Sequence, residues 1–190
     1  LTQTFASPTT ELIIKKFINK YPNIKHIIYD AISDSKALDA FEVSYGVRAL
    51  PTYDFEKASV IVSVSGDFLG DWQGGGFSKG YAKNRVPKNG KMSKHYQIEA
   101  NMSLSGANAD VRLPLKPSSQ IKALLKIYEN ISGQKTGTSL EKQFESKLKT
   151  ISDSLIAAGS SGVFITGLDD VNAQIIALRI NQLIKSKVLN

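Results

Sequence analysis

The stretch 94–118, KHYQIEANMSLSGANADVRLPLKPS, decides the fold of this 190-residue chain. Tyr96 and Ile98 place apolar side chains at alternate positions, which predicts a strand that ends at about residue 99. A polar, glycine-containing loop is expected from 103 to 110. The alternating residues 111–115 then predict a second, short strand.

A helix is expected directly after this second strand. Pro117 fits a first helical position, and Ser118 and Ser119 offer hydroxyl groups for capping. The apolar face of this helix comprises Ile121, Leu124, Leu125 and Tyr128. A strand, a loop at its carboxyl end, a strand and a capped helix form the arrangement in which α/β proteins bind ligands.

The rest of the chain continues this alternation of strands and helices. Further strands are expected at 1–5, 25–30, 58–65 and 163–166, and further helices at 7–20, 34–47, 139–158 and 169–187. Leu38, Phe41 and Val43 form the expected apolar face of the helix at 34–47. The pattern predicts an α/β fold with a doubly wound, mainly parallel sheet and helices on both faces.

The length of the chain fits one α/β domain covering residues 1–190. The chain begins with LTQTF and not with a methionine, so we interpret it as a fragment of a longer protein. Within the domain, 68–93 is expected to be an insertion loop rich in glycine and lysine. No apolar run is long enough to span a bilayer, so direct membrane insertion is not expected.

The net charge of +7 raises the question of nucleic-acid binding. The excess is mostly lysine spread over the expected helix faces, so we expect solvated surface and no nucleic-acid partner. Basic residues are concentrated in one region, which we interpret as a solvated loop or, alternatively, as a docking surface for an acidic partner. It comprises Lys79, Lys83, Arg85, Lys88, Lys91 and Lys94.

The composition excludes several kinds of site. The chain has no cysteine, which excludes disulfides, thiolate nucleophiles and iron–sulfur ligation within these residues. His26 and His95 have no partner at metal-ligand spacing, so no metal site is expected. The glycines at 66–76 do not form a dinucleotide fingerprint, and 133–139 lacks the Gly-Lys-Ser/Thr end of a phosphate loop.

Polar and glycine residues at the expected strand ends remain as candidates for a ligand crevice. They are Gly66, Asp67, Glu99, Asn101, Ser103, Asp110 and Gly167. The alternative interpretation is that they form tight turns.

The order of these features resembles the α/β region of the molybdopterin oxidoreductase family. Ala58-Ser59-Val60-Ile61 leads to Gly66-Asp67, as the family's A-D-V-I strand leads to G-x-N. The run 98–101 stands where the family has V-D-P-R, and Ala109-Asp110 begins the equivalent of its A-D-x-x-L-x-L-x-P-G-T-D segment. The resemblance extends over the whole chain and is most specific at 58–120.

The runs 66–72 (GDFLGDW) and 98–118 are similar to the iron–sulfur subunit family of bacterial alternative complex III, a quinol-oxidising complex. This resemblance implies a molybdopterin-enzyme-like half that holds no cofactor, with the iron–sulfur clusters in the rest of the parent chain. It also implies contacts with the cluster-binding domain and other subunits of a membrane-bound respiratory complex. The expected location is the periplasmic side of the bacterial inner membrane, after twin-arginine export.

The chain departs from the family pattern at the cofactor-binding positions. Asp67 replaces a neutral asparagine, and Asn101 stands where arginine is expected. Ser118 and Gln120 replace a glycine and an acid. An added anion and a missing cation disfavour a pyrophosphate-bearing cofactor by Coulomb's law.

Three hypotheses follow. The first is a non-catalytic scaffold domain of an electron-transfer complex, which is not an enzyme by itself. The second is an active molybdopterin oxidoreductase domain that binds molybdopterin guanine dinucleotide through Gly66, Asp67, Glu99, Ser103 and Asp110. The third is an unrelated nucleotide- or partner-binding α/β domain.

Overall fold

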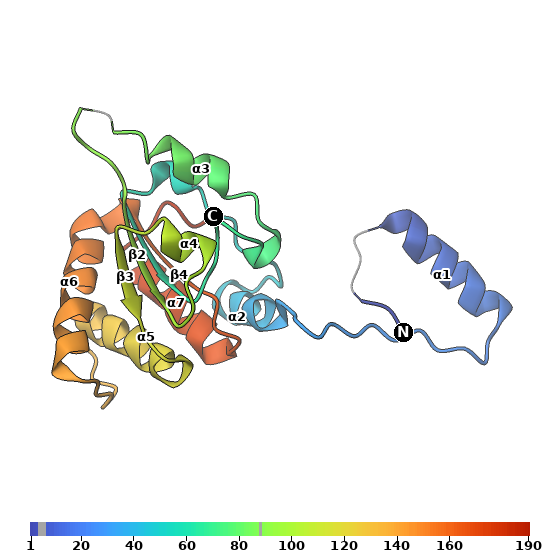
Figure 1. Cartoon of the computed structure of the whole chain (residues 1–190). Coiled ribbons are helices and arrows are strands. Elements are labelled where there is room, and N and C mark those ends of the chain that lie inside the picture. The colour runs from blue at the N-terminus through green and yellow to red at the C-terminus, as the bar shows by residue number, and fades with distance from the viewer. Residues whose placement is uncertain (4–6, 88) are drawn as a thin grey trace. The chain divides into compact units, whose positions relative to one another are not determined.

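A computed structural model describes residues 1–3, 7–87 and 89–190 of the chain. These residues form two compact units, Leu1–Ser33 and Asp34–Asn190. We call them unit 1 and unit 2 and describe each separately (Figure 1).

Unit 1 contains helix α1, Pro8–Lys20. Its beginning follows the expected capping pattern, because the Ser7 hydroxyl accepts a hydrogen bond from the backbone N–H of Thr10 and Pro8 occupies the first turn. The helix ends at Lys20, as the sequence predicts. None of its residues is buried within the unit.

Two strands were expected in unit 1, but the described residues form only an isolated parallel bridge between Thr2 and Ile28. The N–H of Thr2 donates to Ile27 O at 3.1 Å, and the N–H of Tyr29 donates to Thr2 O at 2.9 Å. The prediction of a regular strand at 25–30 is therefore wrong in extent. Part of the strand expected at 1–5, residues 4–6, lies outside the described residues.

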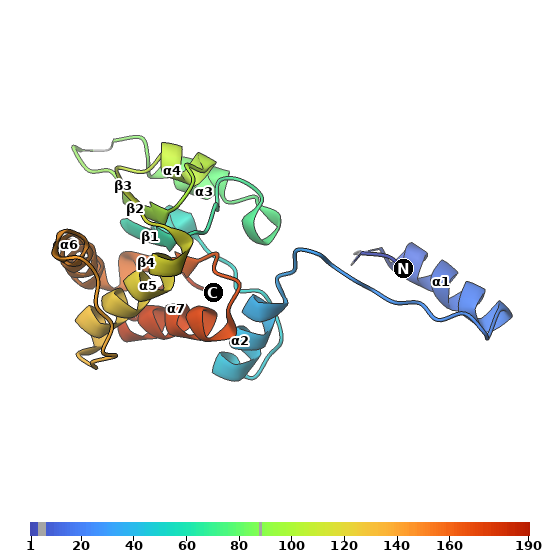
Figure 2. The same ribbon diagram turned by 60° about the horizontal axis from the view of Figure 1, so that its bottom comes forward.

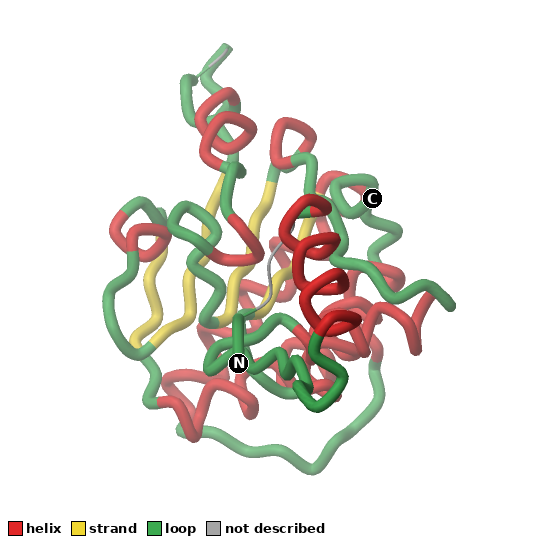
Figure 3. Tube along the Cα trace, turned by 90° about the vertical axis from the view of Figure 1, so that its right-hand side faces the viewer, coloured by secondary structure: helices red, strands yellow, loops and turns green. Residues whose placement is uncertain are grey.

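Unit 2 is built on a four-stranded parallel sheet in its described part. The strands are β1 (Val60–Val64), β2 (Lys94–Glu99), β3 (Val111–Pro114) and β4 (Gly162–Thr166). Their order is β3-β2-β1-β4, and Figure 3 shows them side by side. The expected α/β fold with a parallel sheet flanked by helices is confirmed.

Helices cover both faces of this sheet (Figure 2). One face packs on α5 (Pro117–Ser132), α6 (Lys142–Ala158) and α7 (Val171–Leu183). The other face packs on the 3₁₀ turn Phe55–Lys57 and on α3 (Ser78–Lys83), with Phe68 in the same cluster. No helix in the described ranges is long and apolar enough to cross a membrane.

Helix α2, Ser35–Tyr45, packs against α7 and ends at Gly46, which has a φ of 77°. This left-handed conformation is the one that glycine adopts at little cost at a helix end. The predicted apolar face is partly wrong, because Val43 is 71% exposed. The buried residues of α2 are the small Ala37 and Ala40, which allow α7 to approach closely.

The segment 68–93, expected as an insertion loop, contributes to the core of unit 2. It contains the 3₁₀ turn Trp72–Gly74 and α3. Phe68 and Tyr81 are buried, and their rings meet edge-to-face with centroids 5.6 Å apart.

The outer edge of β4 is closed by side chains from α7 and the residues after it. The Asn181 carboxamide pairs with both backbone groups of Phe164, accepting from its N–H at 2.9 Å and donating to its C=O at 2.7 Å. Gln174 donates to Thr166 O at 3.2 Å, and Ser186 donates to Gly162 O at 2.6 Å. These side chains hydrogen-bond the outward-facing backbone groups of β4, as the backbone of a neighbouring strand would.

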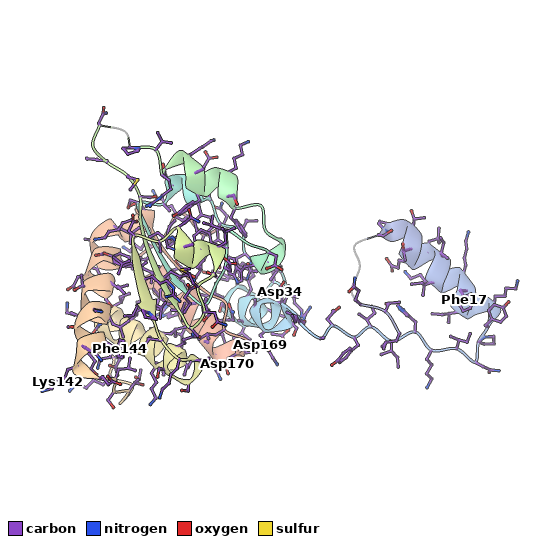
Figure 4. All side chains as sticks on the ribbon, in the orientation of Figure 1. Phe17, Asp34, Lys142, Phe144, Asp169 and Asp170 are labelled. Carbon is purple, nitrogen blue, oxygen red and sulfur yellow. The ribbon has the colours of Figure 1, made fainter. Side chains whose placement is uncertain are left out.

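The beginning of α7 is fixed by a carboxylate cap. Asp170 accepts a hydrogen bond from the N–H of Ala173 at 2.8 Å. Figure 4 labels Asp169 and Asp170 at this helix start, and Lys142 and Phe144 at the start of α6.

Candidate functional site

The candidate site lies at the carboxyl ends of the parallel strands in unit 2. The register aligns Val64 of β1 with Ile98 of β2 and with Thr166 of β4, so the turns after these strands adjoin. Gly66 and Gly167 lie close together there, since a Cβ on Gly167 would come 3.0 Å from Gly66 Cα and 2.3 Å from Ser65 O. The structure brings together Gly66, Asp67, Glu99, Ser103 and Gly167, as the sequence predicts.

Glu99 is the most heavily hydrogen-bonded side chain at this edge. The residue is 4% exposed, and its carboxylate accepts from the Ser103 hydroxyl at 2.6 Å and the Ser103 N–H at 3.1 Å. Arg112 Nε donates to it at 2.7 Å, and Gln97 Nε2 donates at 3.1 Å. Burial alone would raise the pKa of Glu99, but the bonds from Ser103 and Arg112 hold it below its ordinary value.

The short helix α4, Leu104–Ala107, is packed onto this carboxylate. Ser103 caps it by accepting from the Gly106 N–H at 3.0 Å. A Cβ on Gly106 would lie 1.8 Å from Glu99 Oε1, so only glycine permits this approach. The region 103–110, expected as a loop, therefore contains one helical turn fixed by Glu99.

Asp67 is also bound within the chain. Its Oδ1 accepts from the N–H of Ser105 in α4 at 2.8 Å. The hydroxyl of Ser105 in turn accepts from the N–H of Leu69 at 3.0 Å. The loop after β1 is thereby joined to the loop after β2 through a carboxylate and a hydroxyl.

Sequence reasoning did not find the contact between Ser65 and Gln120, which connects the loop after β1 to α5. Ser65 has a φ of 58°, a region that residues other than glycine rarely adopt. Its hydroxyl donates to Gln120 Oε1 at 2.5 Å, and Gln120 Nε2 donates to Leu115 O at 3.1 Å. No sequence motif marks this pair.

Gln97 and Arg112 were missed as well, although the sequence offers a signal for Gln97. His95, Gln97 and Glu99 alternate with Tyr96 and Ile98 along β2, and all of these residues are buried. A row of polar residues on one face of a strand that is buried on both faces indicates a buried hydrogen-bond network.

Asp110 is not part of the site. It immediately precedes β3, so it lies at the amino ends of the parallel strands, where its carboxylate accepts from the His95 N–H at 2.7 Å. Arg85 forms a two-pronged ion pair with it, at 2.7 Å and 2.9 Å. Burial would raise the pKa of Asp110, but the bonds from Arg85 and His95 lower it. Asn101 is exposed in the turn beyond β2.

His95 is buried on the same strand face. Its Nδ1 lies 3.3 Å from the Tyr81 hydroxyl, and its Nε2 lies 3.2 Å from Gln97 Oε1. Burial lowers the pKa of His95 from 6.5 to about 4, because it penalises the charged imidazolium. A hydrogen bond to Gln97 opposes this shift only partly.

The residues of the candidate docking surface do not form one uniform cationic patch. Lys83 pairs with Glu56 at 2.6 Å, and Arg85 is bound to Asp110. Lys79 and Lys91 are exposed. Lys88 lies outside the described residues.

The strand-end groups do not fit molybdopterin guanine dinucleotide. Asp67 and Glu99 place two carboxylates at the edge, and the neighbouring guanidinium of Arg112 is paired with Glu99. A pyrophosphate brought to this edge would meet like charges. Among residues 1–3, 7–87 and 89–190, no group of three or more His, Cys, Asp and Glu side chains could hold a metal ion.

Comparison with known proteins adds no relative. No protein-family model matches the chain, and no curated protein matches it.

Proposed function

We propose that this chain is a non-catalytic, molybdopterin-enzyme-like scaffold domain of the iron–sulfur subunit of a membrane-bound quinol:electron-acceptor oxidoreductase. In that role it packs against the cluster-binding domain and neighbouring subunits on the periplasmic side of the membrane. The sequence resemblance at 58–120 is the source of this assignment. The geometry of the strand-end edge supports the non-catalytic part.

One observation carries the argument, namely that the strand-end carboxylates are used for internal structure. Glu99 and Asp67 both bind backbone N–H groups of the 103–107 segment, and Glu99 also binds Arg112. Buried hydrogen bonds to a charged group contribute roughly 1.5–3 kcal/mol each, so releasing them to admit a ligand is costly. An edge of this kind suits a rigid packing surface better than a nucleotide site.

The decisive experiment is metal and pterin analysis of the purified parent complex. We expect iron without molybdenum, tungsten or an oxidised pterin fluorophore. Stoichiometric molybdenum or tungsten together with pterin overturns the proposal and favours an active molybdopterin oxidoreductase.

A second experiment uses the chain itself and addresses the nucleotide-binding alternatives. Thermal unfolding is measured with GDP, with ATP and with inorganic pyrophosphate, for the native chain and for Asp67→Asn. We expect no shift in Tm with any of them. A saturable shift with GDP that grows in Asp67→Asn supports the cofactor-binding alternative, whereas a shift with ATP alone supports an unrelated nucleotide-binding domain.

The docking role is tested at the two exposed lysines. Replacing Lys79 and Lys91 by glutamate is expected to weaken assembly of the complex, because it reverses the charge that an acidic partner would meet. The matched control replaces Lys142 and Lys147, two exposed residues of α6, in the same way. Equal assembly of both variants removes this surface from the proposal.

A further inference from the structure

Unit 1 presents a strand edge whose backbone groups face outward. The two hydrogen bonds to Thr2 use Ile27 O and the Tyr29 N–H. In a parallel pair, the residue between these two points its own N–H and C=O to the opposite side. Ile28 therefore directs both groups away from Thr2, and no backbone hydrogen bond in the described part of unit 1 uses them.

The side chains around this edge are apolar and open to solvent. Ile28 is 54% exposed, Tyr29 is 66% exposed, and Ile32 is 96% exposed. Ile24 and Ile27 are exposed as well. Strands that are apolar on both faces belong to covered sheets, and none of the described residues of unit 1 covers these side chains.

A groove of about 660 Å³ adjoins the same edge. It runs between α1 and the extended segment, and its apolar walls come from Ile14, Ile18, Ile24, Ile27 and Ile28. Lys15 and Lys25 line it as well. The groove gives the side chains of an added strand a place to pack.

The sequence of the edge is complementary to itself. Residues 24–32 read IKHIIYDAI, and Ile28 is the central residue. Reversal of the segment about Ile28 places Ile24 against Ile32, His26 against Asp30 and Ile27 against Tyr29. Three of the four pairs are therefore apolar with apolar or basic with acidic, and the fourth places Lys25 against Ala31.

We propose that two copies of this chain associate through this edge, with their segments 26–30 antiparallel and Ile28 on the two-fold axis. In this register the outward-facing residues 26, 28 and 30 of one copy meet 30, 28 and 26 of the other. That pairing is what an antiparallel ladder requires, because both residues of each hydrogen-bonded pair direct their N–H and C=O groups to the shared edge. The interface is isologous and closes at two copies.

Charge supports the second copy as the occupant. In this register Asp30 of one copy lies opposite His26 of the other, an acidic side chain facing a basic one across the two strands. Within its own copy, His26 Nε2 lies 2.8 Å from the Thr2 hydroxyl, which orients the ring beside the edge. The proposal goes beyond the scaffold role and does not depend on it.

The first test is the mass of the chain in solution, measured by sedimentation equilibrium for the native chain, Ile28→Lys and Ile28→Glu. The native chain is expected to be a dimer. Each variant is expected to raise the dissociation constant at least tenfold, because two like charges meet on the axis. An equimolar mixture of the two variants is expected to recover a 1:1 heterodimer.

This mixture keeps the test informative if a variant alone folds poorly, because complementation requires contact between the two substituted positions. A monomeric native chain overturns the proposal. A native dimer that both variants leave intact also overturns it. So does a mixture that stays monomeric.

The second test uses the absence of cysteine from the chain. Ile28→Cys is expected to form a disulfide-linked dimer on mild oxidation, since opposed Cα atoms in such a ladder lie about 4.5–5.5 Å apart, within disulfide range. A mixture of Ile27→Cys and Tyr29→Cys is expected to cross-link between unlike chains. Val43→Cys, exposed on α2, is the matched control. Equal cross-linking of the control overturns the proposed register.

Discussion

The outer edge of β4 in unit 2 and the edge at Ile28 in unit 1 have similar sequence patterns, but only the edge of β4 has its backbone groups hydrogen-bonded by side chains. Both segments are apolar on two faces, with Val163-Phe164-Ile165 in one and Ile27-Ile28-Tyr29 in the other. At β4, Asn181 hydrogen-bonds both backbone groups of Phe164, and the strand is fully buried. At Ile28, no side chain of the described residues hydrogen-bonds the outward-facing backbone N–H and C=O. Apolar patterning thus selects extended structure, and separate polar side chains decide whether its edge is closed.

The largest expected effect comes from opening the closed edge. Asn181→Leu leaves the buried N–H and C=O of Phe164 without partners, and each such group costs about 1–3 kcal/mol. We therefore expect the free energy of unfolding of unit 2 to fall by about 4 kcal/mol in urea denaturation. Asn172→Leu makes the same chemical change at an exposed position of α7 and is expected to change stability little. If the two variants are equally stable, the side-chain closure of β4 does not matter.

The second effect is a loss of stability in acid that originates in unit 2. The folded-state pKa of His95 is about 4 against an ordinary 6.5, so the unfolded chain binds the proton more readily. Stability is therefore full above pH 6.5 and falls as the pH drops towards 4, by about 3 kcal/mol in total.

Urea unfolding followed by the fluorescence of Trp72, the chain's one tryptophan, measures this dependence in unit 2. His95→Gln removes the ionisable group and is expected to flatten the slope between pH 6.5 and pH 5. A slope that persists unchanged in this variant would assign the acid sensitivity to other groups.

A smaller effect is expected from the ion pair at the candidate site. Glu99→Gln keeps the shape of the side chain but leaves Arg112 without its counter-charge, which we expect to cost about 2 kcal/mol. Because hydrogen bonds lower the pKa of Glu99, the difference from the native chain should be present at pH 7 and shrink as the carboxylate is protonated. Glu42→Gln, at an exposed residue of α2, is the control. Equal losses for both substitutions would contradict a special role for the buried pair.

The smallest effect is expected in unit 1. Phe17 on α1, labelled in Figure 4, is 50% exposed, so Phe17→Ala removes about half of the area that a fully buried side chain would contribute and is expected to lower stability by about 1 kcal/mol. Circular dichroism of the chain at low micromolar concentration, where self-association is reduced, measures it. A loss above about 2 kcal/mol would show that the face carrying Phe17 is covered in solution.

The sequence predicted the regular elements of unit 2 well, since their signals are local. Pro117 in the first turn of α5, the apolar periodicity of that helix and the buried run of β1 were read directly from neighbouring residues. The expected capping of α5 by Ser118 and Ser119 was wrong, because the N-cap is Lys116 and no side chain caps the helix there. The strand at 25–30 carried the same apolar signal, but a ladder also needs partners, which local pattern does not supply. Val43 was misplaced for a similar reason, because α7 packs on the alanine face of α2.

The candidate site was predictable in part. Strand ends located Gly66, Asp67, Glu99 and Gly167, because the carboxyl ends of parallel strands meet at one edge. Asp110 was misplaced, since a residue that precedes a parallel strand lies at the opposite edge. The contact between Ser65 and Gln120 was missed because it joins positions 55 residues apart in the sequence.

The packing of α4 on Glu99 has a consequence for the evolution of this chain. Position 106 has room for a side chain only if the carboxylate at 99 is shortened or turned away, because a Cβ there would lie 1.8 Å from Oε1. The two positions should therefore change together: a homologue that loses the acid at 99 becomes free to carry alanine or serine at 106, whereas one that keeps the acid keeps the glycine. In an experimental library with both codons randomised, glycine at 106 should dominate among folded variants that retain Glu99 and should lose that dominance where residue 99 is small.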